Sequence, residues 1–257
     1  MGDGDLLKED MGHSMSLQIS EHVRSQVDAL PHKPGVYLMH DVHDTVIYVG
    51  KAIDLHNRVR SYFQPSAWEN KKVRAIASEI SDLQFIVTET ELEALILEAN
   101  LIKQHRPRYN VRLKDDKRYP YIKITWADAY PKVYITRRME QDGSRYFGPY
   151  TSSQAVRQTL DLLRKTFPYL TCNREITGQD DRPCLYYDIK LCLGPCIGAV
   201  TQEEYHAMIR SLSRFLEGHS EEVMANLKKR MQDAADALDF ERAATLRAQL
   251  RAAQHLL

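Results

Sequence analysis

The order of apolar patterns between residues 34 and 105 restricts the fold of this chain most strongly. Two short β-rich runs are separated by a polar segment, which predicts a β-hairpin. The apolar residues that follow recur at helical spacing. A further β-rich run comes next, and a long stripe of apolar residues at helical spacing ends this region. We therefore expect strands at 36–39 and 46–49, a helix capped by Asp54, a helix at 71–80, a strand at 83–88 and a helix opened by a Thr90/Glu93 capping box and ending before Pro107.

The remainder of the chain predicts a second β-containing region followed by helices. Strands are expected at 121–126 and 133–138, and they either extend the first sheet or form a small adjacent lobe. A helix at 153–166 leads into a segment with little periodicity, and a capping box of Thr201 and Glu204 opens a helical end. Breaks at Gly218 and near Asp239 predict a terminal helical hairpin. The predicted strands and helices together give the fold class α+β.

Composition limits the class of protein. The 257 residues carry 35 basic and 35 acidic side chains, so the formal net charge of zero excludes a globally basic surface. No apolar run is long enough to span a membrane, and the acidic start of the chain is unlike a secretory leader, so we expect a cytoplasmic protein. The expected divisions are 1–16 (leader or disordered tail), 17–110, 111–166 (β extension plus helix), 167–200 (cysteine-rich) and 201–257 (helices, with the hairpin at about 220–255).

Glu98 breaks the apolar pattern of its own helix. Its neighbours at helical spacing are Ala94, Leu95, Leu101 and Ile102, so its carboxylate needs a partner. That partner is either a buried hydrogen-bond or ion-pair donor, or a metal ion.

A polar cluster is expected beside the predicted hairpin. Tyr37 and Tyr48 lie on its two strands, and Lys51 follows directly after Gly50. Arg58 and Tyr62 are four residues apart and share one face of the next helix, where the guanidinium can reach a phosphate.

A locally basic segment follows Glu98. Tyrosines are interleaved with its cations, a composition that suits phosphate contacts on DNA, although a solvated charged loop has the same composition. The candidate DNA-binding residues are Lys103, Arg106, Arg108, Arg112, Lys114, Lys117 and Arg118.

The cysteines all fall within one 25-residue stretch, which favours metal ligation over disulfides in a reducing compartment. They are Cys172, Cys184, Cys192 and Cys196. Four thiolates suit a tetrahedral zinc ion or an iron-sulfur cluster, and unligated thiols are the third alternative. Spacing does not choose between them.

The polar residues resemble the motif set of the GIY-YIG nuclease family. The matching positions, with Val in place of Ile in both named motifs, are Gly35-Val36-Tyr37, Tyr48-Val49-Gly50-Lys51, Arg58, Tyr62, Glu98 and Asn110. The resemblance implies that Glu98 binds one Mg²⁺ or Mn²⁺ ion and that Arg58 holds the scissile phosphate. It also implies that Tyr37 or Tyr48 positions or deprotonates the attacking water. We favour Tyr48 as the base, with Lys51 lowering its pKa.

The whole chain after Leu17 further resembles the UvrC family of bacterial nucleotide excision repair. The resemblance rests on the 145–150 turn, the cysteine spacing and the terminal 240–244 segment. It implies a four-iron four-sulfur cluster on the cysteines, with zinc as the alternative, and damaged double-stranded DNA as substrate. It also implies a UVR hairpin that binds UvrB, for which the candidate contact residues are Leu238, Phe240, Ala243, Ala244 and Leu246.

Full members of that family continue into a second nuclease domain that this chain does not contain. The chain therefore resembles their N-terminal half, and the resemblance implies the incision 3′ of a lesion without the 5′ incision. The alternative is a recruitment module that binds UvrB and DNA with little nuclease activity of its own.

Overall fold

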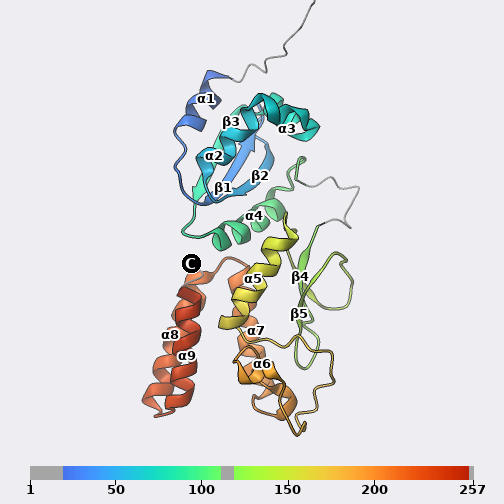
Figure 1. The fold of residues 1–257 in the computed structure, drawn as a ribbon, viewed down its shortest axis with the longest axis vertical. Helices are drawn as coiled ribbons and strands as arrows, with labels where there is room; N and C mark the ends of the chain where they lie inside the picture. Colours follow the sequence, from blue (N-terminus) through green and yellow to red (C-terminus); the bar gives the residue numbers. More distant parts are fainter. Residues whose placement is uncertain (1–19, 111–118, 255–257) are drawn as a thin grey trace, which may run out of the picture.

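The computed structural model describes residues 20–110 and 119–254 and confirms the α+β class. The first unit, residues 20–110, holds one small sheet, and the second unit, residues 119–216, holds another (Figure 1). A two-helix hairpin follows at 220–254. The predictions for residues 1–16 and 111–118 lie outside the described residues.

The first sheet has three antiparallel strands in the order β2-β1-β3. The central strand β1 (Gly35–His40) is buried along its whole length, because it has a strand on each side and helices on both faces. Its neighbours are β2 (Val46–Ala52) and β3 (Asp82–Val87), which confirms the predicted hairpin and third strand.

Short helices cover one face of this sheet. Asp54 caps α2 by accepting from the backbone N–H of Asn57 at 2.8 Å, as the sequence predicts, and Asn70 caps the next helix. These helices share a core with Tyr37, Met39 and Tyr48 of the sheet. In chain order they are α1 (Glu21–Asp28), α2 (Leu55–Arg60), the 3₁₀ turns Ser61–Phe63 and Pro65–Glu69, and α3 (Lys71–Glu79).

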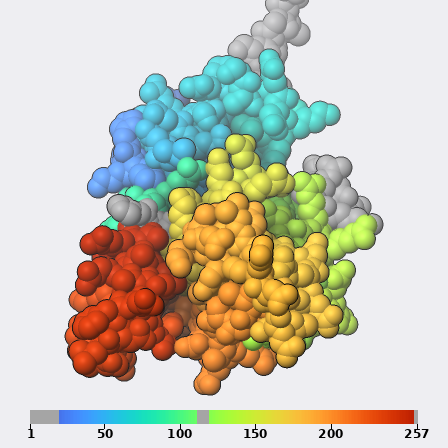
Figure 2. Space-filling view, turned by 60° about the horizontal axis from the view of Figure 1, so that its bottom comes forward, coloured from blue at the N-terminus to red at the C-terminus, as the bar shows by residue number. Residues whose placement is uncertain are grey.

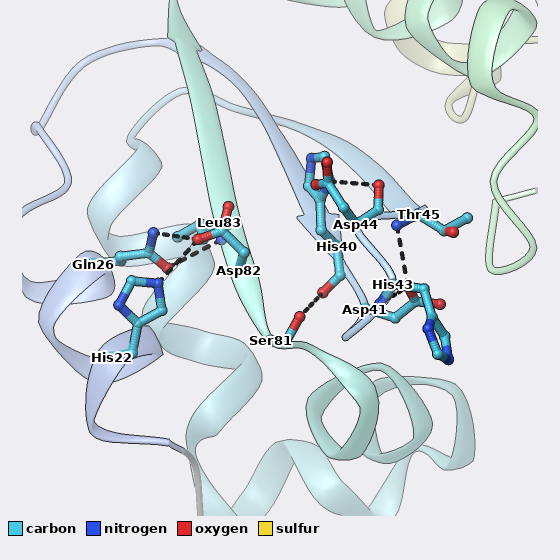
Figure 3. A network of polar contacts seen from close by, with 10 residues as sticks. All are labelled: His22, Gln26, His40, Asp41, His43, Asp44, Thr45, Ser81, Asp82 and Leu83. Carbon is cyan, nitrogen blue, oxygen red and sulfur yellow. Dashed lines mark hydrogen bonds and ion pairs between the residues drawn. The ribbon is translucent and has the colours of Figure 1, made fainter.

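Helix α1 is absent from the sequence-based expectation. It is anchored on the start of β3, where Asp82 accepts hydrogen bonds from Gln26 at 2.8 Å and contacts the His22 ring at 3.1 Å (Figure 3). The Gln26 amide oxygen in turn accepts from the backbone N–H of Leu83. A polar turn lies further along the same network, with Asp41 accepting from two backbone N–H groups of the β1-β2 loop (Figure 3).

Helix α4 (Glu91–His105) lies between two cores. Ala94 and Ile102 pack on the second face of the first sheet, whereas Leu95 and Ala99 belong to the core of the second unit. Figure 1 shows the helix in this intermediate position. Burial on most sides explains why its sequence is apolar over more than one stripe.

The capping residue predicted at the start of α4 is present. Thr90 accepts from the backbone N–H of Glu93 at 3.2 Å, as predicted. The Glu93 carboxylate also accepts from the backbone N–H of Glu89 at 2.9 Å, which ties the start of the helix to the residue before Thr90.

The second region forms a separate sheet, which settles the alternative that the sequence left open. Its order is β5-β4-β6, and all pairs are antiparallel. The strands are β4 (Tyr121–Ile124), β5 (Val133–Thr136) and β6 (Arg145–Phe147), and both longer strands end two residues before the predicted bounds. The helices are α5 (Ser153–Thr166), the short α6 (Leu185–Asp188), the 3₁₀ turn Pro195–Ile197 and α7 (Gln202–Leu216), which begins with the complete capping box predicted at Thr201.

The terminal hairpin consists of α8 (Ser220–Asp236) and α9 (Phe240–Gln254). Asp239 accepts from the backbone N–H of Arg242 at 3.1 Å, which explains the predicted break. Leu227 and Leu246 join the core of the second unit, so the hairpin is docked on this chain (Figures 1 and 2). No helix in the described part of the chain is both long and apolar enough to cross a membrane.

Candidate active site

The strand register brings two tyrosines to one face of the first sheet. Tyr37 pairs with Gly50, and Met39 pairs with Tyr48, so the two tyrosines are diagonal neighbours. The ring of Tyr37 lies directly over Gly50, because a Cβ atom there would stand 2.4 Å from the Tyr37 hydroxyl oxygen. Gly50 therefore makes the space that this tyrosine occupies.

Tyr62 completes a buried cluster with these residues. Its hydroxyl lies 2.8 Å from that of Tyr37, and the ring centroids of Tyr37, Tyr48 and Tyr62 are 5.9–6.1 Å apart. The Arg58 guanidinium lies over the Tyr62 ring, 5.3 Å from its centroid. Helix α2 and the 3₁₀ turn after it thus deliver one cation to the tyrosine face, as the sequence predicts.

Glu98 enters the same region from α4. Its side chain is 2% exposed, and both carboxylate oxygens accept a hydrogen bond. Oε1 accepts from the backbone N–H of Lys51 at 3.1 Å, and Oε2 accepts from the Thr151 hydroxyl at 2.9 Å. Burial raises the pKa of Glu98. The hydrogen bonds from Thr151 and the Lys51 backbone oppose this rise, and so do the charges of Lys51 and Arg58.

The Lys51 ammonium does not act on Tyr48 as we expected. It donates to Glu91 Oε1 at 2.6 Å. Burial, with Tyr62 beside it, raises the pKa of Tyr48, and burial likewise raises that of Tyr37. The protein alone therefore keeps both phenols protonated, and the expected lowering by Lys51 is wrong.

An open cleft of about 650 Å³ collects five of the seven predicted nuclease residues. They are Tyr37, Tyr48, Lys51, Arg58 and Glu98. Tyr62 is buried behind Tyr37. Thr151 also lines the cleft and was missed, because a threonine in a loop before a helix cap carries no periodic or motif signal.

Asn110 acts on the sheet and does not line this cleft. Its side chain is buried and bonds both backbone groups of Val49, accepting from N–H at 2.7 Å and donating to the carbonyl at 2.6 Å. Tyr109 extends this contact by donating its backbone N–H to Ile47 at 3.0 Å. The segment after α4 thereby covers the free edge of β2.

The predicted DNA-binding residues fall into three groups. Lys103 and Arg106 are exposed at the end of α4. Arg108 is already ion-paired with Asp41, at 3.2 Å, and with Glu79. Arg112, Lys114, Lys117 and Arg118 lie outside the described residues.

The four cysteines are free thiols in one neighbourhood. Burial raises the pKa of Cys192, and the charges of Cys172, Cys184 and Cys196 raise it further, which places all three near it. No set of three or more His, Cys, Asp or Glu side chains in the described ranges has metal-binding geometry. Among the described residues, the four thiols are therefore not arranged as a ligand shell.

The candidate partner residues divide between surface and core. Leu238 and Phe240 are 72% and 68% exposed at the hairpin turn, and Ala244 is exposed beside them. Ala243 and Leu246 are buried against this chain.

Three family models match in order along the chain. They are the UvrC-like GIY-YIG domain at residues 33–111, the UvrC/Cho excinuclease middle domain at 119–215 and the UvrB/UvrC motif at 221–256. The first unit, with the cleft, is thus a UvrC-like GIY-YIG domain by class.

Relatives named UvrABC system protein C match most of the chain. The Acetivibrio thermocellus protein is 50% identical over 91% of the chain, and the Moorella thermoacetica protein is 52% identical over 88%. The chain covers 38% and 37% of these relatives, respectively. A solved structure is also similar to the chain: the crystal structure of the GIY-YIG N-terminal endonuclease domain of UvrC from Thermotoga maritima, bound to magnesium as its catalytic divalent cation. Its sequence is 46% identical, and the TM-score is 0.33. The match covers 36% of this chain and 99% of that domain. The chain belongs to the UvrC family.

Proposed function

We propose that this chain cuts one DNA strand 3′ of a lesion in nucleotide excision repair, after recruitment to a UvrB-bound site. The observation that supports the proposal most is the cleft, where a doubly hydrogen-bonded carboxylate, an arginine and two tyrosines face the same open space. A carboxylate and a cation that line one cleft suit a phosphodiester, which needs a metal ligand and a phosphate clamp.

Each residue has a role that its position supports. Glu98 would hold one Mg²⁺ or Mn²⁺ ion, and magnesium commonly uses one or two carboxylates with water and substrate phosphate as its other ligands. A bound ion supplies charge stabilisation at the phosphate and the leaving oxygen. Arg58, stacked on Tyr62, orients the phosphate, and Tyr37 and Tyr48 hold the attacking water by their hydroxyls.

The choice of Tyr48 as the base stays a prediction, and it now requires that something in the cleft lower the pKa of this tyrosine. Because burial raises the pKa of Tyr48, proton transfer to it needs additional positive charge in the cleft. The charge of Arg58 lowers the pKa of both tyrosines and so opposes part of the effect of burial.

The site of incision tests the proposal directly. The chain is added to UvrB bound on end-labelled duplex DNA with one defined lesion and Mg²⁺, and the products are sized. We expect a single nick on the damaged strand 3′ of the lesion. A nick 5′ of the lesion would refute the assigned side, and stable binding without any nick would favour the recruitment module.

We propose that the hairpin supplies the UvrB contact through its exposed turn. Leu238 and Phe240 are large apolar side chains that stay outside the core in the described part of the chain. Ala243 and Leu246 would join the contact only if the hairpin separated from the second unit.

We further propose that Cys172, Cys184, Cys192 and Cys196 hold a four-iron four-sulfur cluster. The anaerobically purified chain is expected to contain about four iron and four acid-labile sulfide per molecule, with visible charge-transfer absorption. Cys192→Ser is expected to lose most of both, because each thiolate is one of four ligands. A colourless chain with about one zinc ion would instead identify a tetrahedral zinc site.

A further inference from the structure

Glu98 is held by a residue from the second unit. The carboxylate belongs to the region that matches the GIY-YIG domain, whereas Thr151 belongs to the region that matches the middle domain. The Thr151 hydroxyl nevertheless donates to Glu98 Oε2 at 2.9 Å, and Thr151 lines the nuclease cleft. The two units therefore meet at the carboxylate that the proposed function makes the metal ligand.

The second donor fixes an orientation that the first donor leaves free. The Lys51 backbone N–H binds only Oε1, so with this bond alone the carboxylate plane can turn about it. With Thr151 bonded to Oε2, both oxygens are fixed and each keeps a lone pair for another partner. Hydrogen bonds of this kind to metal-binding carboxylates set the geometry that the ion meets.

Thr151 is itself held in place by the second unit. The neighbouring Tyr150 is buried and donates its backbone N–H to the Pro120 carbonyl at 3.0 Å. On the other side, Ser152 caps α5 by accepting from the N–H of Ala155. A β-branched side chain between two such anchors has little rotational freedom.

Helices α4 and α5 belong to one hydrophobic core. The face of α4 that carries Leu95 and Ala99 shares a core with Val156 and Leu160 of α5. Figure 1 shows the N-terminal end of α5 next to α4. The position of the hydroxyl relative to Glu98 is therefore set by the docking of the second unit on the first.

We propose that Thr151 is a positioning residue for the metal ligand, so that the second unit contributes an orienting hydrogen bond to the divalent-cation site of the first. This inference rests on the proposed function, since it needs Glu98 to bind the ion. It assigns the second unit a part in the nuclease centre, in addition to any part in holding the cysteines or the hairpin.

Metal binding without DNA tests the inference. Free Mn²⁺ is measured by electron paramagnetic resonance as the whole chain is titrated. Thr151→Val keeps the shape but removes the donor, and the Mn²⁺ Kd is expected to rise about 10–100-fold. Thr151→Ser, which keeps the hydroxyl, is expected to stay within about threefold of the parent chain, because the orienting hydrogen bond is retained.

The matched control is Thr245→Val, the same change on the exposed face of α9, with the Thr245 hydroxyl bonded only to a backbone carbonyl. It should leave the Mn²⁺ Kd unchanged. Nicking assays should show the metal concentration for half-maximal rate raised in Thr151→Val, with the rate at saturating metal nearly restored.

The outcomes separate the two claims. An unchanged or lowered Mn²⁺ Kd in Thr151→Val, with binding still abolished by Glu98→Gln, would refute the positioning role and leave the nuclease proposal standing. Failure of Thr151→Ser to retain affinity would also refute it. A parent chain that binds no Mn²⁺ would overturn both, because Glu98 would then not be a metal ligand.

Discussion

Glu98→Gln is expected to lower Mg²⁺-dependent nicking of UvrB-bound damaged DNA by at least about a thousandfold. A catalytic metal ion contributes several kcal/mol to the transition state, and each 1.36 kcal/mol is a factor of ten in rate. Among the described residues, Glu98 is the one carboxylate that both lines the cleft and is buried. Nicking rates under single-turnover conditions at several Mg²⁺ concentrations measure the loss.

This substitution is expected to leave the fold intact. Gln retains the length of Glu98 and one oxygen that can accept from the Lys51 backbone or from Thr151. Because burial raises the pKa of Glu98, removing its charge also removes a desolvation cost. Thermal unfolding should therefore change little.

Glu93→Gln is the matched control, since it makes the same change five residues earlier on α4 and outside the cleft. Its nicking rate should stay within a fewfold of the parent chain. Retention of nicking by Glu98→Gln would mean that the divalent ion is held elsewhere, and the assigned centre would be wrong.

Local chemistry explains why much of this fold is predictable from sequence. The helix at Ser153–Thr166 and the break at Asp239 follow from side chains that cap their own helix ends. The two tyrosines and Arg58 also meet as expected, because the hairpin and the helix after it place them by short-range geometry. Glu98 joins them from α4, whose apolar pattern the sequence shows.

Long-range contacts explain what the sequence does not reveal. Helix α1 is held by Asp82, more than fifty residues from Gln26, so its own eight residues carry a weak signal. Thr151 reaches Glu98 only because two units dock through α4. The pKa of Tyr48 was misjudged for the same reason, since burial and the Lys51 partner Glu91 are both tertiary features.

Asn110 illustrates how a motif residue can make a structural contact that the motif itself does not reveal. Its position in the motif implied a part in catalysis. Its amide instead satisfies both the N–H and the carbonyl of Val49, at 2.7 and 2.6 Å, on the free edge of β2. Because Tyr48 precedes Val49 on that strand, the amide helps to hold the strand that carries Tyr48.

Asn110→Ala is therefore expected to act mainly on stability. It leaves two buried backbone groups without partners, at about 1–3 kcal/mol each, so unfolding should become easier by about 2–6 kcal/mol. That is a large share of the 5–15 kcal/mol, roughly, that stabilises an ordinary domain. Urea denaturation monitored by circular dichroism measures the change, and Asn226→Ala on the exposed face of α8 is the matched control.

Nicking by the folded fraction of Asn110→Ala distinguishes support of the strand from chemistry. At a low temperature where the variant is still folded, we expect the rate per folded molecule to fall less than about tenfold, because each tenfold requires the loss of 1.36 kcal/mol at the transition state and Asn110 does not line the cleft. The metal concentration for half-maximal nicking should stay unchanged, since neither oxygen of Glu98 contacts Asn110. A loss comparable with that of Glu98→Gln in fully folded protein would instead place the amide in the reaction itself, and β2 would then have to move to bring it to the DNA.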